Sequence, residues 1–310
     1  MSTADPCPLE ALRLQFPVVE RVTYLNHAAV SPLPLRCRAG VLPRVPQLGG
    51  WGAANYERVI GTLRRVRRAC AALLGARPAN VFIVRSTTQG LAVAATGLPV
   101  REGDNVVLVE REFPANLRPW LPLRRRGVEL RLVPQAQGRV RIDDLRRAVD
   151  RRTAALSISF VQFLSGFRVD LAPIGELCRA HDALLVVDAI QGLGAFPLDV
   201  EALGVDLLSA DAHKWLLGPE GVGVGYASDR ALARIEPAVE GWLSVERPFD
   251  FFDLEQPLKA GAARFEEGAY NMAGIYGLEG SLELLASMGP ERIGRRLIAL
   301  TDHLCAGLEG

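Results

Sequence analysis

The chain alternates short, continuous apolar runs with segments in which apolar residues recur every three or four positions. Continuous apolar runs are typical of strands that are covered on both faces, as in a parallel sheet flanked by helices. The strands predicted from these runs are residues 80–84, 105–110, 128–133, 154–160, 183–188 and 221–226. The alternation of strands and helical segments indicates an α/β fold with a largely parallel sheet.

Helices are predicted between these strands and toward both ends, at residues 55–74, 87–96, 143–149, 171–181, 274–287 and 291–308. Gly75 would end the first helix as a C-cap, and Asp170 would begin the fourth as an N-cap. The last segment carries an apolar stripe at spacings of three and four, which should pack on another element. We expect an N-terminal arm (1–22), a large domain (23–260) and the start of a truncated C-terminal domain (261–310).

Composition narrows the class of protein. The 310 residues are 49% hydrophobic and 23% charged, with a net charge of +1, which argues against a nucleic-acid or membrane-surface partner. No apolar run approaches the roughly 18–20 residues of a membrane span, and no secretory signal is visible. The five cysteines form no CxxC pair and the four histidines show no metal-ligand spacing, so no metal site is indicated. We expect a cytoplasmic protein.

Lysine is rare in this chain, because only Lys214 and Lys259 are lysines among the 36 basic residues. Arginine stays protonated, whereas lysine can lose its proton and form a Schiff base. Lys214 lies in SADAHKWLLGPEGVG, a tight, glycine-containing turn that suits an amine presented into a pocket. Lys259, in QPLKAG, fits an ordinary surface lysine. Lys214 is therefore the candidate with a chemical role.

Polar and aromatic residues follow three of the predicted strands, where ligands of parallel sheets bind. Asp188 closes one strand, Ser86–Gly90 (STTQG) opens a helix after another, and Phe113 follows a third. Each has an ordinary alternative: a turn aspartate, a helix cap and a core aromatic. As a set with Lys214, they offer an amine, an acid, an anion site at a helix N-terminus and a ring cover, which is what pyridoxal phosphate (PLP) requires.

The chain resembles the class V aminotransferase-fold enzymes, a group that includes cysteine desulfurases, selenocysteine lyases and isopenicillin N epimerase-like proteins. The motifs that carry the resemblance occur in the family's order, and they are YLNHAAVSPLP, STTQG, EFPANLRPW, SFVQFLSGFRVDL, VVDAIQ, DAHKWLLGPEGVG and RFEEGAYN. The resemblance implies the PLP-dependent transferase fold (fold type I, aspartate aminotransferase-like), with a mostly parallel mixed sheet and an incomplete small domain. It also implies a homodimer with its site at the subunit interface.

The resemblance assigns roles to individual residues. Lys214 would be the Schiff-base lysine and Asp188 the partner of the pyridine nitrogen, so these two are the expected catalytic residues. The remaining cofactor contacts would be Gln162 and Gln191 near the ring hydroxyl, Phe113 stacked on the ring, and Thr87, Thr88 and His213 at the phosphate. His27, in the first motif, would line the substrate entrance, and a turn histidine is the alternative.

Several positions depart from the family pattern. Phe113 stands where desulfurases usually have a histidine, and a phenyl ring cannot transfer protons. Asp211 replaces a serine that contacts phosphate, and Ala269 replaces a threonine offered by the neighbouring subunit. The family's desulfurase cysteine and substrate-carboxylate arginine lie in the C-terminal domain, beyond residue 310. Cys305 comes too soon after Lys214 to match that cysteine, and we expect it in the core.

These observations predict a PLP-dependent enzyme that acts at the α-carbon of an amino acid through Lys214, as an aminotransferase, epimerase or lyase. Lys214, once released from the cofactor, would be the general base and acid at that carbon. One alternative is a cysteine desulfurase or selenocysteine lyase, against which Phe113 weighs. The other alternative is a non-catalytic PLP-fold protein that lacks a complete substrate site.

Overall fold

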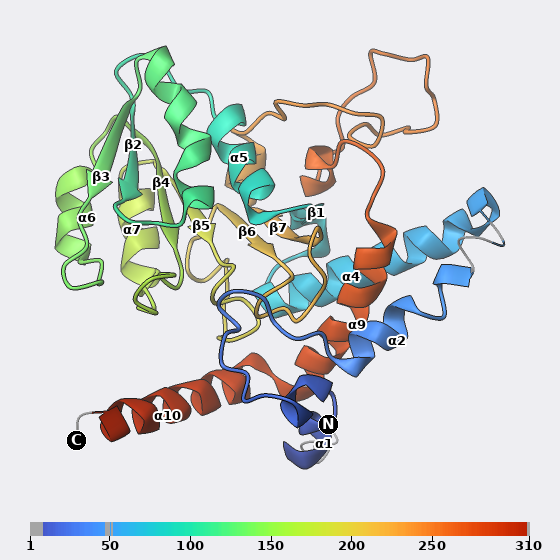
Figure 1. Ribbon diagram of the computed structural model, residues 1–310. Coiled ribbons are helices and arrows are strands. Elements are labelled where there is room, and N and C mark those ends of the chain that lie inside the picture. Colours follow the sequence, from blue (N-terminus) through green and yellow to red (C-terminus); the bar gives the residue numbers. More distant parts are fainter. Residues whose placement is uncertain (1–8, 47–49, 51, 309–310) are drawn as a thin grey trace.

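A seven-stranded sheet forms the centre of the computed structural model, which describes residues 9–46, 50 and 52–308 (Figure 1). The first eight residues of the predicted arm lie outside this range. The strands are β1 (Val81–Val84), β2 (Asn105–Val109), β3 (Glu129–Val133), β4 (Thr153–Ser159), β5 (Leu184–Asp188), β6 (Leu207–Asp211) and β7 (Gly223–Ala227). Their order is β1-β7-β6-β5-β4-β2-β3, and only the pairings of β7 are antiparallel. The predicted α/β fold with a mostly parallel sheet is confirmed.

The predicted helices are present, with ends that differ from the expected positions by at most two residues. The α-helices are α1 (Leu9–Arg13), α2 (Leu35–Val41), α4 (Tyr56–Leu74), α5 (Thr87–Gly97), α6 (Ile142–Ala148), α7 (Ala172–Ala180), α8 (Asp229–Leu232), α9 (Met272–Met288) and α10 (Pro290–Leu308). Short 3-10 helices include η4 (Pro114–Asn116) and η5 (Arg118–Arg126). Gly75 ends α4 with a left-handed φ of 63°, as its predicted capping role requires.

None of the helices in the described part of the chain has the length and apolarity needed to cross a bilayer.

The sequence pattern misses strand β6, as well as the short helices α2 and α8. Two of the five residues of β6, Ser209 and Asp211, are polar, so its apolar run is too short to be recognised. The structure buries both of them, because β6 lies between β5 and β7 in the centre of the sheet. Lys214 therefore follows a central strand, which fixes the start of its turn.

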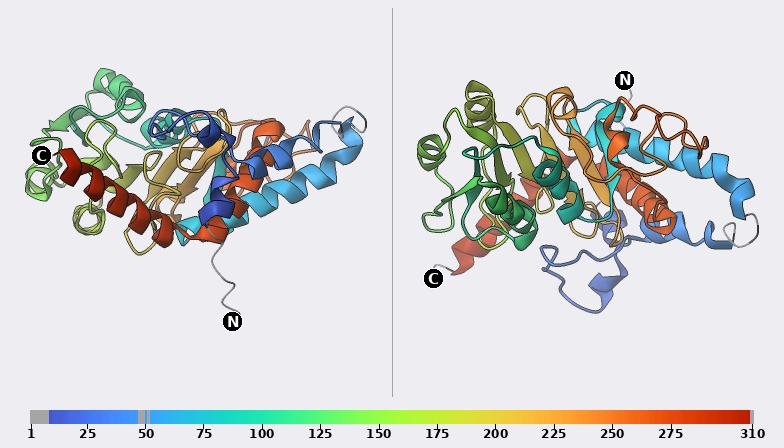
Figure 2. Two further views of the ribbon diagram at one scale, coloured as in Figure 1. Left: turned by 60° about the horizontal axis from the view of Figure 1, so that its bottom comes forward. Right: turned by 90° about the horizontal axis from the view of Figure 1, so that it is seen from above.

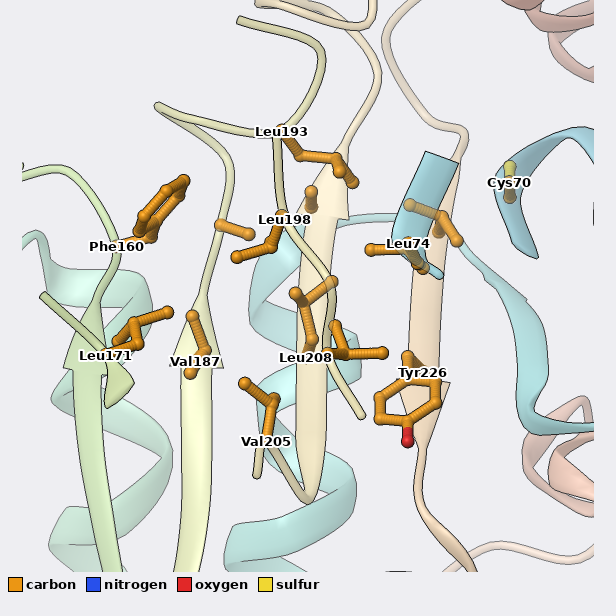
Figure 3. Packing of buried hydrophobic residues seen from close by; sticks show 14 of the residues in the cluster. Cys70, Leu74, Phe160, Leu171, Val187, Leu193, Leu198, Val205, Leu208 and Tyr226 are labelled. Carbon is orange, nitrogen blue, oxygen red and sulfur yellow. The ribbon is translucent and has the colours of Figure 1, made fainter. Parts of the chain in front are cut away.

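The sheet is covered on both faces by separate hydrophobic cores. Val186 of β5 packs with the α5 and η5 side chains, including the fully buried Trp120. The next residue, Val187, belongs to the core on the opposite face with Leu208 of β6 (Figure 3). This core also contains side chains of α4, α7 and α9. Neighbouring residues of one strand thus enter different cores, which explains why the strand sequences are continuously apolar.

Helix α10 differs from expectation. Its first turns pack where Gly294 meets the Phe196 ring, but the helix then extends away from α9 (Figures 1 and 2). The predicted apolar stripe is exposed in its second half, with Leu304 57% exposed. Cys305 is exposed too, so its expected core position is wrong. The domain boundaries at residues 22 and 260 stay predictions.

Truncation of a buried leucine in β6 should destabilise the protein far more than truncation of an exposed leucine in α10. Leu208→Ala removes a fully buried side chain of β6 and should lower the free energy of unfolding by about 2–5 kcal/mol. Leu304→Ala, on the exposed part of α10, should change it by no more than about 0.5 kcal/mol. Urea denaturation of the three proteins measures both values. Equal losses in the two variants would contradict this description of the core.

Candidate active site

The carboxyl ends of β4, β5 and β6 bring the candidate site residues to one edge of the sheet. Asp188 ends β5 and lies in register with Ser159 of β4 and Ser209 of β6. Lys214 follows the end of β6 by three residues. The charges of Asp188 and Lys214 act on each other. This edge is where ligands of open α/β sheets bind.

Asp188 is a buried carboxylic acid, only 2% exposed. Burial raises its pKa to about 7, and the negative charge of Glu112 acts in the same direction. The hydrogen bond that the Ile190 backbone N–H donates to Oδ1, at 3.0 Å, and the charge of Lys214 oppose this rise in pKa. Asp188 can therefore hold a proton near neutral pH.

Lys214 is also buried, with 7% of its surface exposed. Burial lowers the pKa of its amine, while the carboxylates of Asp188 and Asp211 raise it in part. A lowered pKa increases the fraction of neutral amine, which is the nucleophilic form. The other lysine, Lys259, is half-buried rather than the expected surface lysine, and burial lowers its pKa as well. Its ammonium group is engaged, because it donates a hydrogen bond to the carbonyl of Leu243.

Phe113 lies beside this amine, with its ring centroid 5.5 Å from Lys214 Nζ. Its side chain is 44% exposed, so it does not fill a gap in the core. Phe163, from the loop after β4, packs edge-on against it at 5.3 Å between ring centroids. The Phe113 ring therefore has one supported edge and an accessible surface near the amine, as a cover for a flat heterocycle requires.

The N-terminus of α5 lies against the end of β6. Thr87 Oγ1 accepts a hydrogen bond of 3.0 Å from the backbone N–H of Asp211. A Cβ on Gly90 would lie 2.2 Å from Ser209 Oγ, so glycine permits this close approach. Thr88 is exposed on the same turn. The first N–H groups of a helix have no intrahelical partners and favour an anion such as phosphate.

His213 has a buried ring nitrogen beside Asp211. Its Nδ1 atom makes no hydrogen bond with the described residues, although it lies 3.3 Å from Asp211 Oδ1. That carboxylate oxygen accepts a 2.7 Å hydrogen bond from the backbone N–H of the next residue, Ala212. The Nδ1 atom therefore lies against the Asp211 carboxylate, and contact of His213 with a phosphate stays a prediction.

The two candidate glutamines are buried and already hydrogen-bonded within the chain. Gln191 Nε2 donates to the carbonyl of Ala28 at 3.0 Å. Gln162 Nε2 donates to Glu112 Oε1 at 2.9 Å, and its Oε1 accepts from Gln135 Nε2 at 2.9 Å. Glu112 was not among the predicted site residues. Its only signal was an acidic residue placed between a predicted strand and Phe113.

The segment before α2 crosses the loops that follow β5 and β6 (Figure 1). Ser31 donates its backbone N–H to the carbonyl of His213 at 2.7 Å. The His27 ring stacks on Trp215, the neighbour of Lys214, with ring centroids 5.2 Å apart. His27 thus lies close to the lysine turn. Whether it lines a substrate entrance stays a prediction.

The residues at this edge fit PLP. They supply a buried amine for its aldehyde, a protonatable acid for its ring nitrogen, an aromatic cover, and a helix N-terminus for its phosphate.

Residues 53–310 match the family model for Aminotransferase class-V. The chain belongs to the class V aminotransferase family. A relative from Methanothermobacter thermautotrophicus, named "Probable cysteine desulfurase", is 30% identical over 305 residues, which are 96% of this chain and 75% of the relative. A cysteine desulfurase of Salmonella typhimurium is 31% identical over 309 residues, covering 93% of this chain and 74% of the relative.

Solved structures confirm the expected fold of PLP-dependent transferases. The apo cysteine desulfurase of Thermococcus onnurineus NA1 has a TM-score of 0.88 at 23% identity, covering 100% of this chain and 78% of its own. A mutant of C-DES, with glycine covalently linked to its PLP cofactor, has a TM-score of 0.81 at 25% identity, covering 89% of this chain and 74% of its own. The family is PLP-dependent, and PLP is the cofactor of this chain.

Burial of Asp188 predicts a pH-dependent stability of the cofactor-free protein. Its ordinary pKa is 3.8 and its pKa in the folded chain is about 7, so stability should be lost as pH rises from about 4 to about 7. Asp188→Asn should abolish this component, which amounts to about 4 kcal/mol. Asp302→Asn, on exposed α10, should follow the wild-type curve. Urea denaturation between pH 4 and pH 8 tests this, and parallel curves for wild type and Asp188→Asn would contradict it.

Proposed function

We propose that this chain is a PLP-dependent enzyme that acts at the α-carbon of an amino acid, with Lys214 as the residue that binds the cofactor covalently. The observation that carries this proposal is the environment of Lys214. Its amine is buried, has a lowered pKa and lies next to an accessible aromatic ring. Such an amine is poised to react with an aldehyde, whereas a surface lysine is not.

The residues around Lys214 would hold the other parts of the cofactor. When bound, PLP supplies an electron-accepting ring for the electron pair left at the α-carbon when a bond there breaks. Asp188 would share a proton with the ring nitrogen, because its buried carboxyl group can carry one near neutral pH. Phe113 would cover one face of the ring and limit access of water. The remaining cofactor contacts in this proposal are Thr87, Thr88 and His213 at the phosphate, and Gln162 and Gln191 near the ring hydroxyl.

Proton transfer at the α-carbon falls to Lys214 in this proposal. The amine can accept a proton when neutral and return it when charged, and its lowered pKa brings both forms closer to neutral pH. Phe113 has no titratable group, so it leaves this task to the lysine. A homodimer that completes the site remains a prediction.

Cysteine desulfuration is the second candidate reaction. The relatives and solved neighbours favour it, because they are named as cysteine desulfurases. Phe113 argues against it, since it replaces the histidine expected in desulfurases with a side chain that cannot transfer protons. Selenocysteine cleavage also calls for a side chain at this position that can transfer a proton. Both reactions are lyase alternatives to transamination and epimerisation.

Reductive trapping tests the role of Lys214. Borohydride should fix the bond between cofactor and amine, and peptide mass spectrometry should locate the added mass on Lys214. Lys214→Ala should lose the visible absorption of bound PLP and the added mass. Lys259→Ala is the matched control, because it removes the only other lysine and should keep both signals. An adduct on Lys259, or none on the wild type, would overturn the assignment.

A panel of amino acids separates the candidate reactions. Transamination should release a keto acid, epimerisation the opposite enantiomer, and cysteine desulfuration alanine together with sulfane sulfur. We expect products at the α-carbon without sulfur release, because of Phe113. Phe113→His should raise any cysteine desulfuration. Alanine and sulfur from the wild type would favour the second candidate, and no spectral change with any amino acid would favour a non-catalytic protein.

A further inference from the structure

Glu112 is a buried acidic residue to which the proposed function gives no task. It follows β2 by three residues and is only 4% exposed. The preceding residue, Arg111, has a left-handed φ of 57°, which turns the chain at this point. Glu112 is also directly followed by Phe113. The residue is thus built into the loop that carries the ring cover.

Both oxygens of Glu112 accept hydrogen bonds from the end of β4 and the loop after it. Oε1 accepts from the Ser159 backbone N–H at 2.7 Å and from Gln162 Nε2 at 2.9 Å. Oε2 accepts from the Ser159 hydroxyl at 2.5 Å. Three donors on one buried carboxylate tie the Phe113 loop to β4. We call this arrangement of Glu112, Ser159 and Gln162 the Glu112 clamp.

The clamp fixes the orientation of the Gln162 amide. An ionised carboxylate only accepts hydrogen bonds, so the amide nitrogen must face Glu112. The same nitrogen lies 3.4 Å from the Ser159 carbonyl, and the amide oxygen accepts from Gln135. A flipped amide would place two acceptors against each other. The side chain proposed to lie near the ring hydroxyl is therefore held in one orientation by Glu112.

Glu112 also acts electrostatically on Asp188. The Glu112 carboxylate is hydrogen-bonded to Ser159 of β4, and Ser159 is the register partner of Asp188 on the neighbouring strand β5. Burial has the largest effect on the pKa of Asp188, the Glu112 charge raises that pKa further, and the Lys214 charge lowers it. The charge of Asp211 raises the pKa of Lys214. Among the described residues, Glu112 and Lys214 are the charged side chains that act on Asp188.

We propose that Glu112 is a positioning residue of the cofactor site, which clamps the Phe113 loop and Gln162 to β4 and supplies a fixed negative charge near Asp188. This inference rests on the proposed function. A proton shared between Asp188 and the ring nitrogen leaves that pair without net charge, and its loss leaves one negative charge. A nearby anion opposes this loss, so Glu112 favours the protonated pair.

The chemistry of the clamp offers a variant that removes only the charge. In Glu112→Gln, the amide oxygen can take the place of Oε1 and accept from the Ser159 N–H and from Gln162. The amide nitrogen can take the place of Oε2 and donate to the Ser159 hydroxyl, which also accepts. Glu112→Ala removes both the clamp and the charge. Glu110→Gln, an exposed position two residues earlier, is the matched control for loss of one negative charge.

The test is a pH titration of the absorption of bound PLP, together with a fluorescence measurement of the PLP dissociation constant. Glu112→Gln should lower the apparent pKa of the bound cofactor by about one unit, the order of the effect expected from removal of one nearby negative charge. Its dissociation constant should stay within about threefold of the wild-type value. Glu112→Ala should raise that constant at least tenfold, and Glu110→Gln should leave both quantities unchanged.

Different failures have different meanings. A loaded Glu112→Gln protein with the wild-type titration would overturn the electrostatic role. Wild-type PLP affinity in Glu112→Ala would overturn the clamp. If Glu112→Ala does not fold, Glu112→Gln decides through its titration. A wild-type protein that binds no PLP would overturn the role assigned to Lys214, and not merely the inference about Glu112.

Discussion

Burial of opposite charges at the carboxyl edge of the sheet is the constraint on which the candidate site depends. Asp188 and Lys214 are both removed from water, and burial drives each toward its neutral form. Their mutual attraction offsets part of this cost and keeps the two groups responsive to neighbouring charges. In water the same residues would be a permanent anion and a permanent cation. The fold thereby raises the pKa of Asp188 to about 7 and lowers the pKa of Lys214.

The fold maintains this edge through close packing between α5 and β6. Gly90 allows the helix to approach Ser209, and Thr87 accepts the backbone N–H of Asp211. The same packing places the N-terminus of α5 next to the turn that begins after β6. Asp211 is accommodated because its carboxylate binds the Ala212 N–H. The departure from the family's serine is thus compatible with an anion site.

The chain shares its fold with cysteine desulfurases, but the face of the site near Lys214 has its own character. Phe113 and Phe163 form an edge-to-face pair there, and neither can exchange a proton. His27 stacks on Trp215, the residue after Lys214. In the proposed function, Lys214 and Asp188 are the groups that handle protons. Family membership fixes the cofactor, and the aromatic surroundings bear on which reaction follows.

The sequence by itself determined the class of fold, most strands and helices, and the candidates Lys214 and Asp188. Strand and helix periodicity are local, and a lysine in an arginine-rich chain stands out without any structure. Only the tertiary structure revealed β6, because its polar residues are buried by neighbours distant in the chain. It also decided the exposure of Cys305 and the place of Glu112, whose partner Gln162 is 50 residues away. A hydrogen bond across such a separation leaves no periodic pattern, since it arises from the packing of strands and not from their composition.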